Sequence, residues 1–260
     1  MGTWVKERKV ARCIADDLRT LGVRRGAALM VHVSLSAMGH VAGGAETVIQ
    51  GLFQVLGPEG TLLMPALSYE IVTPENPVFD VRRTPSNVGA VPEFFRTRPG
   101  TCRSVHPTHS VCGVGPLAEA LLGEHILDDT PCGPHSPFRR LRDVGGQILM
   151  LGCGLEPNTS MHGIEEFVEP PYLFGSPLIY RLVLADGRVQ HKAYRPHSFL
   201  GWVQRYDRVG ALLGQDGLER GAVLAARAYL IEAPALWDAV LAALGQDPLY
   251  FVDRASEVQA

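Results

Sequence analysis

Short, continuous apolar runs alternate with amphipathic segments as far as residue 168, and this alternation restricts the fold more than any other feature. Residues 27–33, 61–64 and 147–151 are such runs, which are typical of strands buried on both faces. Apolar residues also recur at helical spacing in segments 10–21 and 46–56. Strand–helix alternation of this kind predicts an α/β protein built as a three-layer α/β/α sandwich.

The remainder of the sequence has a different pattern. Segments 178–184 and 189–194 flank an Asp-Gly turn, which is the signature of a β-hairpin. We therefore expect an antiparallel β/α part appended to the sandwich, in a single domain of residues 1–260 with a candidate sub-domain at about 175–232. Further helices are predicted at 91–96, 116–122, 161–168, 199–212 and 234–244, further strands at 106–111 and 223–231, and an irregular stretch at 65–89.

Composition and charge exclude several classes of function. The net charge is −3 and no basic block is present, so binding to nucleic acid through its phosphates is not expected. The sequence has no run of about 18 apolar residues that would predict a membrane span. Its N-terminus lacks the apolar core of a signal peptide, and its five cysteines include no Cys-x-x-Cys pair. We expect a cytoplasmic protein, a monomer or homodimer, with free thiols and no membrane partner.

The first chemically interesting segment joins a buried strand to a glycine-containing loop. His32 lies in the strand, and Ser34, Leu35 and Ser36 follow it ahead of several glycines and the helix that begins near Glu46. Glycines let backbone N–H groups approach a phosphate, and a helix N-terminus adds partial positive charge. The segment matches no named phosphate motif, so a plain strand–loop–helix connection is the alternative interpretation.

A second polar segment concentrates ring nitrogens, hydroxyls and a guanidinium within eight residues. Such groups are suited to phosphate, to pantetheine amides or to a metal. If the segment is a strand, alternation places His106 and His109 on opposite faces, which argues against a shared metal. A polar edge strand is the alternative interpretation. The candidate residues are Arg103, Ser104, His106, Thr108 and Ser110.

A third segment places a histidine at the start of a predicted helix. The Asn158-Thr159-Ser160 run is a natural helix start, so His162 falls in the first turn and Glu165 lies three residues later on the same face. A carboxylate beside an imidazole fixes its tautomer and raises its basicity. The pattern therefore indicates a general base with its orienting group, or alternatively a solvated His/Glu pair.

Seven segments taken together resemble the aminoglycoside 3-N-acetyltransferase family. They fall in family order from about residue 5 to 252, so the resemblance covers nearly the whole chain. The longest, such as DDTPCGPHSP and LGCGLEPNTSMH, are specific to that family. The segments are VHVSLSAMGHVAGGAET, LGPEGTLLMP, TPSNVGAVPEFFR, RSVHPTHSV, DDTPCGPHSPFRRL, GGQILMLGCGLEPNTSMHGIEE and DPLYFV.

The resemblance implies a function and a donor. It implies a non-GNAT α/β/α enzyme that transfers an acetyl group from acetyl-CoA directly to the 3-amino group of 2-deoxystreptamine aminoglycosides, which confers antibiotic resistance. The family's base falls on His162, with Glu165 as its partner, and no metal is expected. The resemblance places CoA near His32, Ser34, Leu35 and Ser36, and near Arg103, Ser104, His106, Thr108 and Ser110.

The sequence departs from the family pattern on the acceptor side. Where relatives often carry an acidic residue, this sequence has His197, which we assign both to catalysis and to the acceptor site. Residues Tyr69, Glu70, Asp80 and Glu166 are further candidates for holding the acceptor. Because His197 makes this region less acidic, an acetyltransferase for another amine remains an alternative, as does a CoA-binding protein without aminoglycoside activity.

Two other chemistries compete with direct transfer. In metal-assisted hydrolysis, His109, His162 and Glu165 would be the ligands, but no second ligand set supports this. In a covalent route, Cys153 would be the nucleophile and His162 its activator. Cys153 lies between two glycines, where a small packing residue is the simpler interpretation.

Overall fold

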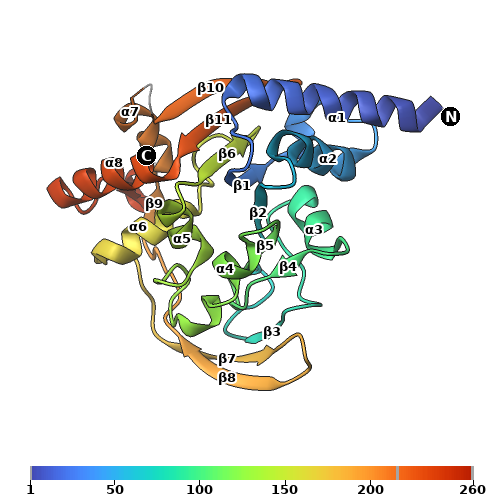
Figure 1. Cartoon of the computed structure of the whole chain (residues 1–260). Helices are drawn as coiled ribbons and strands as arrows, with labels where there is room; N and C mark the ends of the chain where they lie inside the picture. Colours follow the sequence, from blue (N-terminus) through green and yellow to red (C-terminus); the bar gives the residue numbers. More distant parts are fainter. Residues whose placement is uncertain (1, 215–216, 259–260) are drawn as a thin grey trace.

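A mixed seven-stranded sheet forms the centre of the molecule (Figure 1). The computed structural model describes residues 2–214 and 217–258. The sheet order is β10-β11-β6-β1-β2-β5-β4, in which β6, β1 and β2 are parallel and the other neighbours are antiparallel. Its strands are β1 (Ala28–Val33), β2 (Thr61–Pro65), β4 (Cys102–Arg103), β5 (Val111–Val114), β6 (Gln147–Leu151), β10 (Leu218–Val223) and β11 (Ala226–Glu232).

Helices cover both faces of this sheet, which confirms the predicted three-layer fold. Alternate residues of β1 enter two separate apolar cores, with Leu29 and Val31 in one and Met30 in the other. The first core is closed by α1 (Gly2–Leu21), α2 (Gly44–Leu56) and α3 (Ala90–Thr97). The second is closed by α4 (Ala118–Leu122), α5 (Pro137–Asp143), α6 (Ser160–Val168), α7 (Val209–Leu212) and α8 (Ala233–Gln246).

Two small sheets flank the sandwich. Strand β3 (Val78–Asp80) pairs with the predicted hairpin of β7 (Leu178–Val183) and β8 (Val189–Tyr194), at the lower edge in Figure 1. Strand β9 (Trp202–Gln204) pairs with β12 (Val252–Arg254). The candidate sub-domain is thus divided, because β7 and β8 belong to a small sheet whereas β10 and β11 extend the central one. The short helices are η1 (Leu35–Met38), η2 (His125–Leu127), η3 (Tyr206–Arg208) and α9 (Ala255–Val258).

Three predicted elements are wrong. The helix expected at 199–212 is replaced by β9, η3 and one turn of α7, because residues 202–204 pair with β12. The strand expected at 106–111 begins only at Val111, after a turn around Pro107, which has no backbone N–H to donate to a ladder. The single strand expected at 223–231 is a hairpin, turned at Leu224 with φ 52°.

The parallel strands end together at one edge of the sheet, and this edge positions the site. In open α/β sheets, ligands bind beyond the carboxyl ends of such strands. Ser34 follows β1 there, and Gly152 follows β6 with φ 75°. A side chain at Gly152 would lie 2.6 Å from the Cβ of Ala37, so glycine is required where the two loops approach each other. Within residues 2–214 and 217–258, no helix has the length and apolar character needed to cross a bilayer.

A histidine-rich candidate active site

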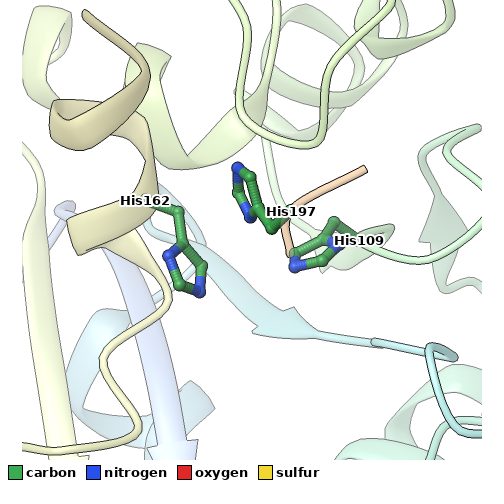
Figure 2. A group of neighbouring side chains, drawn as sticks. All are labelled: His109, His162 and His197. Carbon is green, nitrogen blue, oxygen red and sulfur yellow. The ribbon is translucent and has the colours of Figure 1, made fainter. Parts of the chain in front are cut away.

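A cavity of about 440 Å³ lies at the carboxyl edge of the parallel strands. Its wall includes His32 from β1 and Cys153 from the loop after β6. Three further histidines from distant segments line it, namely His109 before β5, His162 in α6 and His197 after β8. Figure 2 shows the side chains of these three pointing toward one another. The fold therefore gathers imidazoles at the position where the sheet topology predicts a ligand site.

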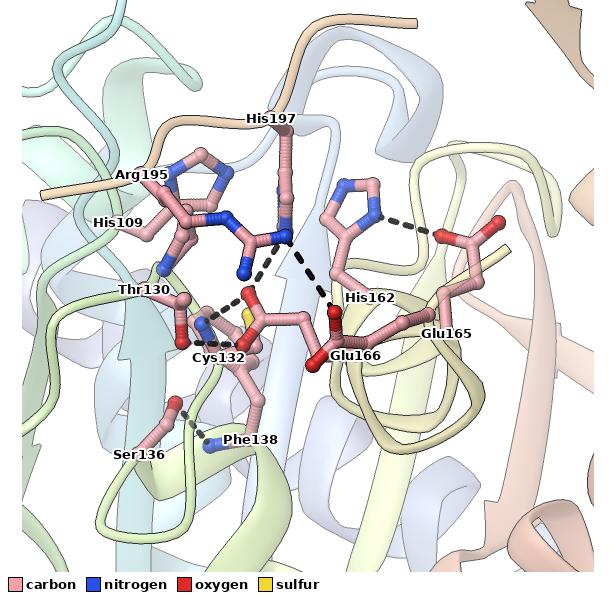
Figure 3. Close-up of polar contacts among 12 residues, drawn as sticks. His109, Thr130, Cys132, Ser136, Phe138, His162, Glu165, Glu166, Arg195 and His197 are labelled. Atoms are coloured by element: carbon pink, nitrogen blue, oxygen red, sulfur yellow. Dashed lines mark hydrogen bonds and ion pairs between the residues drawn. The ribbon is translucent and has the colours of Figure 1, made fainter. Parts of the chain in front are cut away.

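His162 is held through its Nδ1 atom. Because α6 begins at Ser160, His162 lies in the first turn, as predicted. Its Nδ1 lies 3.2 Å from Glu165 Oε2 and 2.9 Å from the hydroxyl of Tyr206 (Figure 3). The Tyr206 and Tyr172 hydroxyls donate to the two oxygens of Glu165 at 2.6 and 2.8 Å. A carboxylate held in this way accepts the Nδ1 proton, which leaves Nε2 as the basic nitrogen.

A second histidine–carboxyl pair lies beside the first. His197 Nε2 is 2.7 Å from Glu166 Oε1, and both side chains are almost completely buried. Glu166 also accepts from the Thr130 hydroxyl at 2.5 Å and the Cys132 backbone N–H at 2.7 Å (Figure 3). Burial raises the pKa of Glu166 to about 7 despite these donors, and burial followed by the charge of His162 lowers the pKa of His197 well below its usual value.

His109 completes the cluster from a buried turn. Its Nδ1 lies 2.9 Å from the hydroxyl of Thr108. Its ring centroid is 5.8 Å from that of His162 and 5.2 Å from that of His197. Burial is the main cause that lowers the pKa of His109 well below the usual value, followed by the neighbouring histidines. This imidazole is therefore neutral at physiological pH.

The predicted serine loop lines a neighbouring cavity of about 700 Å³. Ser34, Leu35 and Ser36 all contribute to its wall, and the Ser34 and Ser36 hydroxyls lie 3.2 Å apart. Val33, Val88 and Cys153 line both cavities, so the two spaces adjoin. A ligand that lies along the serine loop can therefore reach the histidines. His32, whose pKa burial lowers to about 3, lies in the inner cavity.

The second polar segment is tied into the protein framework. Arg103 donates to the Ser110 hydroxyl and to the backbone oxygens of Ala66 and Thr84, and burial lowers its pKa to about 10. Ser104 Oγ lies 2.9 Å from Nδ1 of His125. His106 Nδ1 accepts the backbone N–H of His109 at 2.9 Å. A role for these residues and Thr108 in CoA binding stays a prediction.

The predicted acceptor residues occupy different environments. Tyr69 lines the inner cavity and a third cavity of about 430 Å³, which also includes Thr108, His109 and His197. Glu70 is exposed, and Asp80 Oδ1 accepts the backbone N–H groups of Arg82 and Arg83 in a turn. Of the acidic candidates, Glu166 alone is in direct contact with a cavity histidine.

Sequence reasoning missed the two tyrosines that hold Glu165. Tyr206 lies 41 residues from Glu165 along the chain, in a segment expected to be an amphipathic helix. Tyr172 follows α6 closely, but no pattern in the sequence marks its hydroxyl as a donor. Glu156, another cavity residue, was also not singled out. These contacts depend on the tertiary fold rather than on local spacing.

The two competing chemistries are placed differently by the structure. Burial raises the pKa of Cys153 to about 11, which disfavours the thiolate that a nucleophile needs. The ligand set expected for hydrolysis is not assembled, because Glu165 is bonded to the two tyrosines and to His162. In its place, His197 joins His109 and His162 as the third member of a histidine group.

Residues 30–244 match the sequence model of the family described as aminoglycoside 3-N-acetyltransferase. The chain belongs to this family. It is accordingly an acyltransferase, and the resemblance inferred from the seven segments is confirmed. It is 34% identical over 252 residues to aminoglycoside N(3)-acetyltransferase VII of Streptomyces paromomycinus, an alignment that covers 85% of this chain and 86% of the relative.

Solved structures of the same family share the fold. AAC-IIIb, in a binary complex with CoASH, is similar with a TM-score of 0.78 and 30% identity, covering 90% of this chain and 95% of that one. A mutant of AAC(3)-IVa in complex with a gentamicin is similar with a TM-score of 0.79 and 30% identity, covering 94% and 92%. This family fold contains the histidine-lined cavity described above.

Proposed function

We propose that this enzyme transfers an acetyl group from acetyl-CoA directly to an amine, with His162 as the general base. The observation that carries the proposal is the arrangement of His162 in the cavity wall, with Nδ1 engaged by Glu165 and Tyr206. The family relatives named for 3-N-acetylation, together with the complexes with CoASH and gentamicin, support acetyl-CoA as donor and an aminoglycoside 3-amino group as acceptor.

The proton balance follows from the chemistry of amines. An aliphatic amine is mostly protonated at neutral pH, and only the free amine attacks a thioester. Nε2 of His162 accepts the proton as the amine nitrogen bonds to the thioester carbonyl carbon. The resulting tetrahedral intermediate then expels the CoA thiolate, which takes up a proton to leave as the thiol. Such a base is worth roughly 10²- to 10⁴-fold in rate.

The serine loop is suited to stabilising the oxyanion of that intermediate. Ser34 and Ser36 are beside the cavity junction, and hydroxyl or backbone N–H groups are the usual oxyanion donors. CoA along this loop places its thioester near Cys153, whose side chain belongs to both walls. This arrangement brings donor and base to the same cavity without an acyl-enzyme.

The acceptor side of the cavity is weakly acidic. Among the described residues that line the inner cavity, Glu156 supplies the one carboxylate. A polycationic aminoglycoside therefore gains fewer charge-assisted hydrogen bonds than a strongly acidic pocket would provide, each worth roughly 1.5 to 3 kcal/mol. The 2-deoxystreptamine aminoglycosides remain the proposed acceptor class, and a less cationic amine is the second candidate.

A thiol-release assay with acetyl-CoA and a panel of amines tests this function. The panel should contain gentamicin-, neomycin- and apramycin-type aminoglycosides together with simple amino sugars that carry one amine. We expect amine-dependent thiol release and a product whose added acetyl group maps to one nitrogen by NMR. If no amine releases thiol from a folded enzyme that binds CoA, the chain is a CoA-binding protein and the proposal is wrong.

We expect Ser34→Ala and Ser36→Ala to weaken CoA binding or to slow transfer, without unfolding the protein. Both hydroxyls lie at the carboxyl end of β1, on the wall of the outer cavity. Calorimetry with CoA and steady-state kinetics measure the two effects separately. If neither CoA affinity nor kcat changes in either variant, the loop takes no part in donor binding or oxyanion stabilisation.

We expect Cys153→Ala to keep near-full activity, because direct transfer needs no cysteine nucleophile. The Sγ atom lies 3.6 Å from the backbone oxygen of His32 and packs in the wall between the cavities. Mass spectrometry after mixing with acetyl-CoA in the absence of amine provides the check. Detection of acetylated Cys153, together with an inactive alanine variant, would establish the covalent route instead.

A further inference from the structure

Three histidines in the inner cavity present nitrogens to one point. One ring nitrogen from each of His109, His162 and His197 lies within 4.8 Å of the other two. The side chains come from a turn, from α6 and from the segment after β8, and they converge in Figure 2. We propose that these three histidines form a binding site for one ion of the Zn²⁺ class.

The opposite nitrogen of each ring is already engaged. Nδ1 of His109 lies 2.9 Å from the Thr108 hydroxyl, and Nδ1 of His162 lies against Tyr206 and Glu165. Nε2 of His197 lies 2.7 Å from Glu166. Metal-binding histidines almost always use their second nitrogen in this way, because the outer hydrogen bond fixes the ring and its tautomer.

The remaining nitrogens are available for coordination. Within the part of the chain that the structure describes, Nε2 of His109, Nε2 of His162 and Nδ1 of His197 accept no hydrogen bond from the protein. His197 Nδ1 is also buried away from solvent, so the protein alone leaves a buried lone pair without a partner. Such an atom costs free energy unless a ligand, ion or water satisfies it.

The dimensions fit a tetrahedral site after a small adjustment. Zn–N bonds of about 2.0 to 2.1 Å in a tetrahedron place ligand nitrogens about 3.3 Å apart. The longest separation must therefore shorten by about 1.5 Å from the 4.8 Å limit, which rotation of the three side chains can supply. The fourth position faces the cavity, and Glu165 and Glu166 behind the rings balance the charge of the ion.

Occupancy of this site has a consequence that rests on the proposed function. A metal bound to Nε2 of His162 uses the lone pair that the base needs for the amine proton. The ion would also occupy the space where the amine approaches the three rings. We therefore expect Zn²⁺ to inhibit acetyl transfer while CoA still binds to the serine loop.

The site is tested by metal binding to the full chain after treatment with a chelator and removal of that chelator. We expect calorimetry to show one Zn²⁺ per chain with an affinity tighter than micromolar. His109→Ala and His197→Ala should each weaken Zn²⁺ binding by about 100-fold or more, since even loss of an outer hydrogen bond to a ligand costs about 10- to 100-fold. His191→Ala is the matched control, because His191 is exposed on β8.

Cobalt provides a measurement that does not depend on any variant. Co²⁺ in the native protein should show the strong visible absorption of a tetrahedral ion, and Zn²⁺ should abolish it by displacement. Zinc affinity in folded His109→Ala and His197→Ala equal to that of the native protein, or a weak octahedral cobalt spectrum, would overturn the site. These measurements need no acceptor, so they stand apart from the outcome of the amine panel. Zinc-stimulated transfer would contradict the inhibitory consequence.

Discussion

Replacing His162 by alanine is expected to lower kcat by at least about 10²-fold, while CoA affinity changes little. The ring lies in the cavity wall with Nδ1 held by Glu165 and Tyr206, so its removal takes away the proton acceptor. The serine loop lies in the adjoining cavity and is not altered. Steady-state kinetics at saturating acetyl-CoA, with calorimetry for CoA, separate the two effects.

The exposed residue His191 supplies a matched control for the loss of an imidazole. His191→Ala should retain the kcat of the native enzyme. Circular dichroism and thermal unfolding should show that the His162 variant is folded, because its side chain is near the surface of a cavity rather than within an apolar core. Near-full turnover in folded His162→Ala would remove this residue from the mechanism.

Glu165→Gln is expected to lower kcat by about 10²- to 10⁴-fold, with little change in the KM for acetyl-CoA. The native carboxylate accepts hydrogen bonds from Tyr172 and Tyr206 and receives Nδ1 of His162. An amide of the same shape directs N–H groups at one of these donors. The imidazole then loses the partner that fixes its tautomer, and Nε2 is no longer reliably the basic atom.

Glu169→Gln is the control for removing one carboxylate near the end of α6. Glu169 is exposed and its pair with Arg195 is on the surface, where ion pairs contribute about 0 to 1 kcal/mol. This variant should keep the native kcat. If Glu165→Gln is folded and retains native kcat, then the buried carboxylate does not orient the base.

Local spacing was sufficient to predict one part of the candidate site. The Asn-Thr-Ser run before Met161 marked the start of a helix, and a separation of three residues placed Glu165 beside His162. The same logic correctly placed the serine loop after β1, because a buried strand followed by glycines must turn at the sheet edge. Their catalytic roles remain predictions.

The rest of the site depends on contacts between distant segments. His109, His162 and His197 converge although they come from three separate elements, and no periodicity relates them. Tyr206 was hidden in residues 199–212, where apolar spacing favoured a helix but pairing of β9 with β12 prevailed. The polar segment around Arg103 had the composition of a ligand site, yet its side chains largely satisfy backbone groups.

Amine-dependent thiol release, measured in parallel on the native enzyme, Cys153→Ala and His162→Ala, tests the central claim most directly. The account predicts that the native enzyme and Cys153→Ala turn over at similar rates, and that His162→Ala binds CoA but transfers at least about 100-fold more slowly. Turnover by His162→Ala near the native rate, or an inactive Cys153→Ala with an acetylated cysteine in the native enzyme, would contradict direct transfer with His162 as the base.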